Sequence, residues 1–364
     1  MKYNFTNSKI GICFPNIYDD DISWFRNQPD PLTKNERNEV EKIYQDIINS
    51  NKLNKNIKSL HCLLNFLIKT DKISKVTKNV INDSIKLLKY ETKLRILSKK
   101  KNNFEVKNNE IFDNFLKNGI YGFHIDNNLL KKLKLNLKSK INKLKVMEKP
   151  KMEIYERGYL LERTLGLGKD SLDIINEILI DKDIFNISRK YYNCNFILDS
   201  AILHRSTDED EHCIQTLNDL IKNNPPRHKN CHIDPKLNIK CMIYLSDVGI
   251  DDGPFHYVKG SHLFKKNNIV KRNIAKSINV YNINNTPDKR IEFLCLPKDF
   301  QNSSNFGNYI LNDSKNGLFL KDNLKPLTSD VGNLFIFDPD GIHMGGNTNG
   351  GERMAIQVIL KPQI

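Results

Sequence analysis

The chain has 364 residues, of which 39% are hydrophobic and 27% charged, with only 17 glycines and 13 prolines. This composition excludes a collagen-like or low-complexity chain and argues against extensive disorder. No stretch approaches the roughly 18 apolar residues of a membrane span, and the first residues lack the apolar run of a signal peptide. We therefore expect a soluble, cytoplasmic protein.

Lysine and arginine outnumber aspartate and glutamate by 57 to 43, which gives a formal net charge of +14. Such an excess is found in proteins that bind nucleic acid or anionic membranes. The lysines are scattered, however, and no aromatic residues are interleaved with them at stacking spacing. Asn, Ile and Lys are abundant throughout, as an AT-rich coding sequence favours. We therefore do not expect the protein to bind nucleic acid.

The seven cysteines contain no Cys-x-x-Cys pair. A chain of this length buries enough apolar surface to fold without disulfides. The sequence therefore predicts reduced thiols in a reducing compartment.

The predicted elements begin with a helical N-terminal region over residues 1–109. Residues 33–36, Thr-Lys-Asn-Glu, have the spacing of a capping box at a helix start. Apolar residues then recur at the i, i+3, i+4 and i+7 spacing of an amphipathic helix, at Val40, Ile43, Tyr44 and Ile47 and again at Leu60, Leu63, Leu64 and Leu67. No residue in this region suggests a chemical site.

The second predicted region covers residues 110–364. It opens with a strand at 119–125, a helix from Asp126 to about residue 144 and a second helix around 172–179. Short apolar runs bounded by Gly, Pro, Asn and Asp then predict strands at 196–204, 228–233, 238–246, 255–258, 332–337 and 353–361. Such a series indicates a sandwich or jelly roll. A polar insertion at about 263–325 is expected to be a lid or substrate-binding excursion.

The segment Cys231-His232-Ile233-Asp234-Pro235 carries a candidate metal site. Side chains at i and i+2 of a strand point to the same face, so His232 and Asp234 can offer an imidazole and a carboxylate to one ion. His343 follows a later strand and a turn, and it would complete a two-histidine, one-carboxylate set. Such a set leaves coordination positions on the metal open and is typical of non-haem Fe(II) oxygenases.

Arg353 opens the last predicted strand and is the candidate ligand for an organic acid. Its planar, permanently charged guanidinium suits a carboxylate, such as the far carboxylate of 2-oxoglutarate. By strand alternation Gln357 shares the face of Arg353. Lys240 and Tyr244 share a face of another strand, which we expect to look into the barrel. These three residues are further candidates for the cosubstrate or substrate pocket.

Other histidines are interpreted as structural. The triplet His124-Ile125-Asp126 repeats the His-x-Asp pattern, but Asp126 falls where a helix N-cap is expected. His256 and His262 follow a Gly-Pro turn and are assigned to the scaffold.

Taken in order, these motifs resemble the phytanoyl-CoA dioxygenase family of Fe(II)- and 2-oxoglutarate-dependent oxygenases. The resemblance covers roughly residues 110–364 and rests on five stretches that keep their order and spacing. The first three are His232 to Asp234, Lys-Cys-Met-Ile-Tyr-Leu-Ser-Asp-Val at 240–248 and Gly-Pro-Phe-His-Tyr-Val-Lys-Gly-Ser-His at 253–262. The last two are Gly-Asn-Leu-Phe at 332–335, leading to His343, and Gly-Glu-Arg at 351–353.

The resemblance implies an α+β fold with a double-stranded β-helix, a cupin-like jelly roll with flanking helices. It implies Fe(II) held by His232, Asp234 and His343, 2-oxoglutarate held by Arg353, and O2 as the oxidant. Similar proteins hydroxylate a small molecule and release succinate and CO2. The aspartate at 234 argues against the halogenating relatives, which lack that ligand. Gly345 and Gly346 stand where relatives carry a hydroxyl residue that assists cosubstrate binding.

Two other functions stay open at this point. One is a cupin-like metal-dependent enzyme that does not use 2-oxoglutarate. The other is a non-catalytic module whose basic helical region contacts anionic partners. Neither the substrate nor the oligomeric state follows from the sequence.

Overall fold

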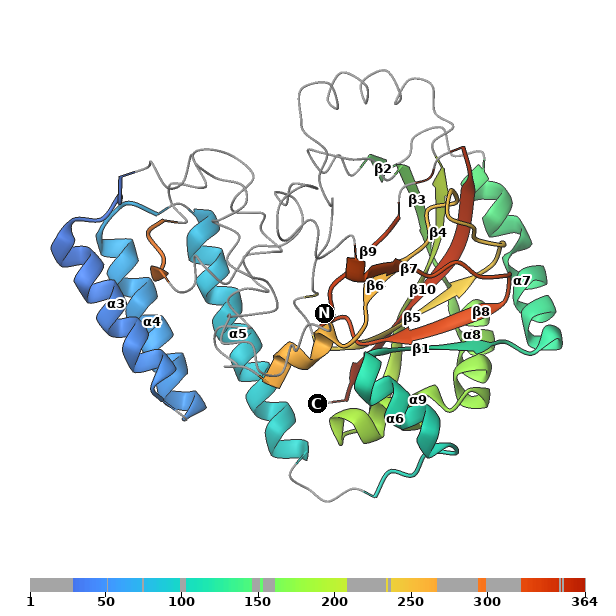
Figure 1. The fold of residues 1–364 in the computed structure, drawn as a ribbon, viewed down its shortest axis with the longest axis horizontal. Helices are drawn as coiled ribbons and strands as arrows, with labels where there is room; N and C mark the ends of the chain where they lie inside the picture. The colour runs from blue at the N-terminus through green and yellow to red at the C-terminus, as the bar shows by residue number, and fades with distance from the viewer. Residues whose placement is uncertain are drawn as a thin grey trace. The chain divides into compact units, whose positions relative to one another are not determined.

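The computed structural model describes residues 29–50, 52–73, 75–98, 103–145, 151–152, 161–207, 234, 237–266, 294–298, 322–346, 348 and 350–363 (Figure 1). The chain divides into two compact units, each described here by itself. The first comprises Met1–Ile96, Arg227–Lys236 and Leu263–Lys321, and the second Leu97–Pro226, Leu237–His262 and Asp322–Ile364. None of the described helices combines the length and apolar character needed to cross a bilayer.

The first unit is helical in its described part, with α3 (Lys34–Ile48), α4 (Leu53–Lys69) and α5 (Lys75–Ser98). The predicted capping box is present, because Thr33 Oγ1 accepts from the Glu36 N–H and the Glu36 carboxylate accepts from the Thr33 N–H at 2.7 Å. The predicted helical spacing is also confirmed. One core buries Val40, Tyr44 and Ile47 of α3 together with Leu60, Leu63, Leu64 and Leu67 of α4.

Residues 294–296 belong to the same core, although they lie far along the chain from the helices. Leu294, Cys295 and Leu296 are almost fully buried among the helix residues. Arg37 of α3 donates to the Leu296 carbonyl at 2.8 Å and to the Leu294 carbonyl. The predicted division at residue 109 and the predicted limits of the 263–325 insertion stay predictions.

The second unit contains a seven-stranded antiparallel sheet, called here the large sheet. Its strand order is β1-β8-β5-β10-β4-β3-β2. The strands are β1 (Ile120–His124), β2 (Lys151–Met152), β3 (Leu161–Gly166), β4 (Phe196–Thr207), β5 (Ile239–Tyr244), β8 (Asn333–Phe337) and β10 (Glu352–Pro362).

A second antiparallel sheet of three strands, called here the small sheet, has the order β7-β6-β9. Its strands are β6 (His256–Val258), β7 (Leu324–Pro326) and β9 (His343–Met344), and the 3-10 helix η1 (Ser261–Lys266) follows β6. From β5 to β10 the chain passes from the large sheet to the small one and back twice. Neighbours in sequence are therefore often in different sheets.

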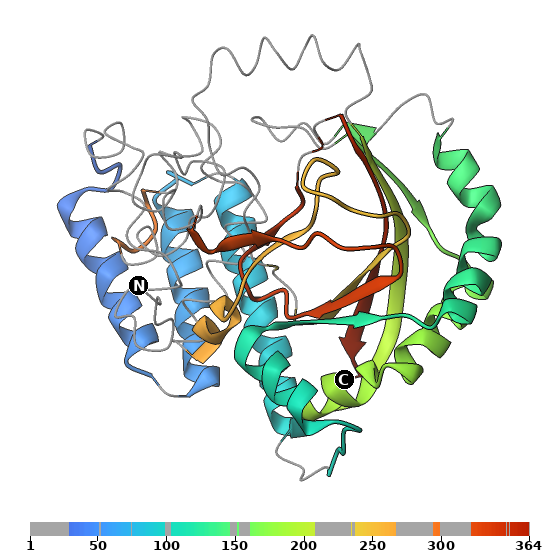
Figure 2. The ribbon, with the colours of Figure 1, turned by 45° about the vertical axis from the view of Figure 1, so that its right-hand side comes forward.

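The helices of this unit are α6 (Asn109–Asn118), α7 (Asn127–Lys145), α8 (Lys169–Asp181) and α9 (Ile184–Tyr192). α8 and α9 contact β4, and α7 contacts β3 and α8. In Figure 2 α7 and α8 lie on one side of the large sheet and the small sheet lies on the other. The face of the large sheet that looks toward the small sheet is called the inner face below.

The register between strands defines the inner face. Arg353 pairs with Ser206, Ala355 pairs with Tyr244, and Phe337 pairs with both Ile120 and Lys240. The aromatic and aliphatic members of this face form one buried core with residues of the small sheet and its loops, made of Ile120, Met242, Tyr244, Val248, Phe255, Tyr257, Phe337 and Ala355.

The α+β class is therefore confirmed, and so are most predicted elements. Strands predicted at 119–125, 196–204, 238–246, 255–258, 332–337 and 353–361 correspond to β1, β4, β5, β6, β8 and β10, and the helix at 172–179 corresponds to α8. The strand predicted at 228–233 lies outside the described residues. The sequence did not predict β2, β3, β7, β9, α6 or α9, because strands of two to six residues and helices of nine or ten residues give little periodicity.

Candidate active site

His343 begins β9 and is buried, with 3% of its surface exposed. Its Nδ1 lies 2.8 Å from the Gly341 carbonyl oxygen. A carbonyl only accepts, so Nδ1 carries the proton and, in the neutral ring, Nε2 carries the lone pair. A backbone carbonyl on the second ring nitrogen is the usual arrangement for a metal-binding histidine.

Two aromatic rings surround the His343 imidazole. The Phe337 ring centroid is 5.5 Å away and the Phe255 centroid is 5.7 Å away. Phe337 comes from the end of β8 in the large sheet, and Phe255 comes from the residue before β6. The imidazole is therefore held in a mainly apolar environment between the two sheets, which restricts its rotation.

Arg353 lies near the start of β10 and is also buried, with 3% of its surface exposed. Its Nη2 donates to Ser206 Oγ of β4 at 3.1 Å, and its Nη1 donates to the Gly253 carbonyl. These two acceptors are both uncharged. They fix the plane of the guanidinium on the inner face, as a bidentate contact to a carboxylate requires.

The positive charge of Arg353 acts on two neighbouring side chains. Burial raises the pKa of Tyr244, and Arg353 opposes this shift. Burial lowers the pKa of His256, and Arg353 adds to that lowering. Tyr244 Oη donates to the Leu327 carbonyl at 2.9 Å and accepts from the Phe255 N–H at 3.0 Å, so it also fixes the loop beside the His343 ring.

The other predicted pocket residues share the inner face. Gln357 pairs with Met242, and Lys240 pairs with Phe337 and Ile359. Both side chains are partly exposed, whereas Tyr244 is fully buried. The expected alternation along β5 and β10 is therefore present. Their roles at a pocket stay predictions.

Of the other two predicted metal ligands, His232 and Asp234, the structure describes only Asp234. His232 lies outside the described residues, and Asp234, which is buried with 8% exposed, belongs to the first unit. Within the part of the chain that the structure describes, no group of three His, Cys, Asp or Glu side chains is placed to hold a metal ion. The three-ligand site therefore stays a prediction.

Contacts of Asp126, His262 and His256 support the structural interpretation of these three residues. Asp126 caps α7, since its carboxylate accepts from the N–H groups of Asn128 at 2.9 Å and Leu129 at 3.3 Å. His262 is fully buried and its Nε2 donates to the Leu116 carbonyl at 3.0 Å. His256 Nδ1 donates to the Pro254 carbonyl at 2.7 Å. These bonds give all three residues a scaffold role.

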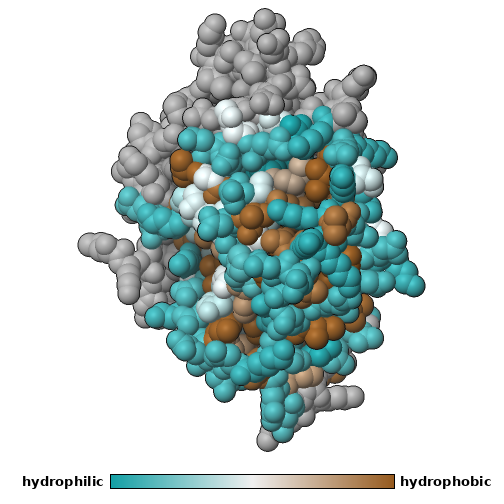
Figure 3. Space-filling view, turned by 90° about the vertical axis from the view of Figure 1, so that its right-hand side faces the viewer, coloured by the Kyte–Doolittle hydropathy of each residue, from teal (hydrophilic) through white to brown (hydrophobic). Residues whose placement is uncertain are grey.

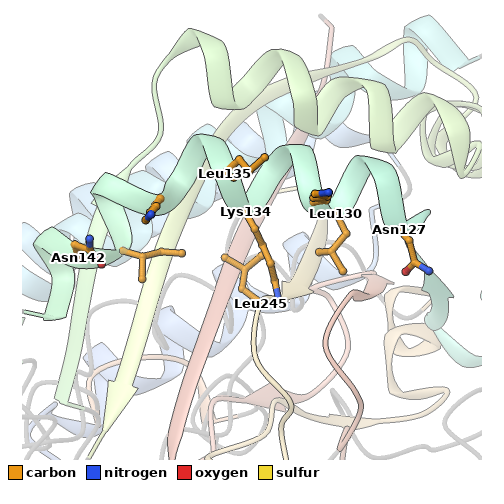
Figure 4. A pocket seen from close by; sticks show the side chains of 9 residues that line it. Asn127, Leu130, Lys134, Leu135, Asn142 and Leu245 are labelled. Carbon is orange, nitrogen blue, oxygen red and sulfur yellow. The ribbon is translucent and has the colours of Figure 1, made fainter.

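A groove of about 510 Å³ lies elsewhere, along α7 (Figure 4). The view of that side of the molecule shows apolar patches between hydrophilic ones (Figure 3). Leu245 follows Tyr244 and so points to the opposite face of the large sheet. The groove is therefore not the predicted site. Its lining is Asn127, Leu130, Lys131, Lys134, Leu135, Lys138, Ile141, Asn142 and Leu245.

Sequence reasoning missed the groups that hold the two central side chains. These are Ser206 and the Gly253 carbonyl on Arg353, and the Gly341 carbonyl on His343. A known pairing of β4 with β10 would have pointed to Ser206. A carbonyl gives no signal in a sequence, because every residue has one.

No protein-family model matches the sequence, and a search of curated proteins found no match. Among solved structures, AviO1 from Streptomyces viridochromogenes Tue57 is similar at 13% identity and a TM-score of 0.39, over 72% of this chain and 97% of that one. HygX from Streptomyces hygroscopicus with nickel and 2-oxoglutarate bound is 15% identical at a TM-score of 0.40, over 71% and 88%.

The epimerase SnoN in complex with Fe3+, alpha ketoglutarate and nogalamycin RO is 10% identical at a TM-score of 0.41, over 70% of this chain and 83% of that one. TM-scores of this size do not establish a common fold. The function of this chain therefore has to be argued from its own residues.

Proposed function

We propose that the protein is an Fe(II)- and 2-oxoglutarate-dependent dioxygenase that hydroxylates a small molecule, with His232, Asp234 and His343 as the iron ligands. When bound, ferrous iron with 2-oxoglutarate and O2 supplies the oxidation of a C–H bond, with succinate and CO2 as co-products. The residues of this chain bind and orient these groups and keep water out.

The observation that carries the proposal is the bond from His343 Nδ1 to the Gly341 carbonyl. It fixes the tautomer whose Nε2 lone pair suits a metal ion, in a buried place between two sheets. The scaffold residue His256 has the same tautomer, with Nδ1 on the Pro254 carbonyl, but it is only partly buried. His343 combines this tautomer with burial beside the rings of Phe255 and Phe337.

Arg353 supports the cosubstrate part of the proposal. A buried guanidinium held flat by Ser206 and Gly253 is suited to bind the far carboxylate of 2-oxoglutarate. Tyr244 keeps the adjoining loop in place, while Phe255 and Phe337 exclude water around His343. Gln357 and Lys240, farther along the inner face, are the proposed further contacts to cosubstrate or substrate.

The order of the strands supports a double-stranded β-helix. In chain order β4, β5, β8 and β10 belong to the large sheet, and β6, β7 and β9 belong to the small one. Two facing antiparallel sheets with such crossings are typical of jelly rolls and cupins.

The test is an anaerobic titration of the full-length protein with Fe(II) and 2-oxoglutarate, followed by the weak visible charge-transfer band of the chelate. Wild type should develop the band. His343→Gln and Asp234→Ala should abolish it by losing iron. Arg353→Ala should keep iron, measured by metal content, while the band requires much more 2-oxoglutarate.

A matched control comes from the second His-x-Asp triplet. His124 is exposed at the end of β1, so His124→Gln should leave both affinities unchanged. If wild type binds neither Fe(II) nor 2-oxoglutarate, or if Arg353→Ala leaves 2-oxoglutarate binding intact, the proposal is wrong. Succinate release in a screen of candidate metabolites then identifies the hydroxylated substrate.

A further inference from the structure

The turn that connects β8 to His343 is unusually well buried for a loop. Asp338, Asp340 and Ile342 have no exposed surface. The turn begins at Asp338, whose N–H donates to the Gly119 carbonyl at 2.8 Å. Burying two acidic residues is costly unless hydrogen bonds stabilise them. The contacts of Asp338 are therefore informative.

The Asp338 carboxylate accepts two short hydrogen bonds. Tyr191 Oη of α9 donates to Oδ2 at 2.6 Å, and the Asp340 N–H donates to Oδ1 at 2.9 Å. Burial, and after it the negative charge of Asp338, raise the pKa of Tyr191 well above its usual range, so its hydroxyl keeps the proton it donates. The carboxylate thus ties helix α9 to the backbone of the turn.

The carbonyl of the same residue closes the turn. The Asp338 carbonyl accepts from the Gly341 N–H at 3.0 Å and from Tyr257 Oη at 2.9 Å. Gly341 in turn offers its own carbonyl to His343 Nδ1. Asp338 therefore holds Gly341 from its N–H side, while Ser261 Oγ accepts from the Ile342 N–H at 2.7 Å in the peptide that carries the Gly341 carbonyl. That carbonyl selects the tautomer of His343.

We propose that Asp338 is a positioning residue for His343, acting with Tyr191 through the Gly341 peptide. This inference rests on the proposed function, since it assigns the purpose of the network to metal binding. Asp338 does not touch the metal in this account. It holds the carbonyl that keeps the Nε2 lone pair available and correctly aimed.

The experiment compares Asp338→Ala with Asp338→Asn and Tyr191→Phe in the full-length protein. Asparagine keeps an acceptor for the Asp340 N–H and can still pair with Tyr191, whereas alanine keeps neither bond. We expect Asp338→Ala to lower the affinity for Fe(II) about tenfold. Asparagine should restore an affinity close to that of wild type, and Tyr191→Phe should lie between the two.

A second readout does not require metal. Long-range ¹H–¹⁵N correlation spectra of the histidine rings in the metal-free protein report which ring nitrogen is protonated, and His343→Gln assigns the signal. His343 should show the Nδ1–H tautomer in wild type and in the asparagine variant, and a mixture of tautomers in Asp338→Ala.

Ser171→Ala is the matched control, because Ser171 is fully buried and its Oγ makes a 2.6 Å bond to Asn136 between α8 and α7. It should reduce stability without changing the tautomer or the Fe(II) affinity. The inference is overturned if Asp338→Ala keeps the pure Nδ1–H tautomer, or if Ser171→Ala changes the tautomer as much. Should wild type bind no Fe(II), the proposed function fails by itself, while the tautomer comparison still decides the role of Asp338.

Discussion

Replacing Gly341 by alanine perturbs the turn at one defined point. An added Cβ would lie 2.0 Å from Tyr257 Oη and 2.4 Å from its Cζ, whereas real Cβ atoms essentially never approach another heavy atom within 3.0 Å. The Tyr257 ring would have to move by roughly an ångström. It has little room to do so, because only 1% of its surface is exposed and Phe337 lies edge-on at 6.2 Å.

The cost of Gly341→Ala has two parts. Moving the ring breaks the bond from Tyr257 Oη to the Asp338 carbonyl and leaves buried polar groups unsatisfied, which costs about 1–3 kcal/mol. Overpacking a close-packed core costs about a further 1–3 kcal/mol. The free energy of unfolding should therefore fall by roughly 2–6 kcal/mol, a large share of the 5–15 kcal/mol typical of a domain.

Urea unfolding followed by circular dichroism measures this loss in the metal-free protein. Gly166→Ala on β3 is the control, because no atom lies within 4 Å of its added Cβ, and it should be close to neutral. If Gly341→Ala were as well tolerated as Gly166→Ala, the packing of Tyr257 against the turn would be refuted. Folded Gly341→Ala protein should also bind Fe(II) more weakly if His343 is a ligand as proposed, since the loss of the Tyr257 bond loosens the turn that carries the acceptor of His343 Nδ1.

Three other predictions concern single contacts. If Arg353 binds 2-oxoglutarate as proposed, Ser206→Ala should raise the KM for 2-oxoglutarate about tenfold with little change in kcat, because Arg353 loses one of its two hydrogen-bonded supports. The pKa of Glu36 is lowered to about 2, first by the hydrogen bond from Lys72. The stability that this bond contributes is therefore present above pH 4.5 and is lost as the pH falls toward 2. Lys72→Met should flatten this pH dependence in an acid titration followed by the circular dichroism of the helices. Arg37→Gln should destabilise the first unit by about 1–3 kcal/mol in thermal melts, and Lys86→Gln, at an exposed ion pair, by less than about 1 kcal/mol.

The parts of the fold that the sequence predicts well have a repeating pattern longer than a few residues. The capping box at Thr33 and Glu36 and the buried positions of α3 and α4 follow from the 3.6-residue period. The inner face of β5 and β10 follows from the two-residue period of strands, and the register then places Arg353, Gln357, Tyr244 and Lys240 on it.

Pairing between distant segments is what the sequence leaves open. β9 has two residues and β7 three, so neither shows a period, yet β9 positions His343 by pairing with β6. The 294–298 segment gives no sign that it packs among helices of the N-terminal region, because Leu-Cys-Leu is compatible with many environments. Only a three-dimensional arrangement selects one of them.

The sequence pointed to His343 and Arg353 by the chemistry of their side chains, but it did not point to the groups that support them. The same physical reason explains both results. An imidazole and a guanidinium are rare functional groups, so their order along the chain carries information. Their supports at Gly253 and Gly341 are backbone carbonyls, which every residue possesses. At Gly341 only the missing side chain is distinctive, because a Cβ there would displace Tyr257. The glycine itself is required by the packing of Tyr257 and not by the carbonyl contact, since the same contact to His256 comes from Pro254.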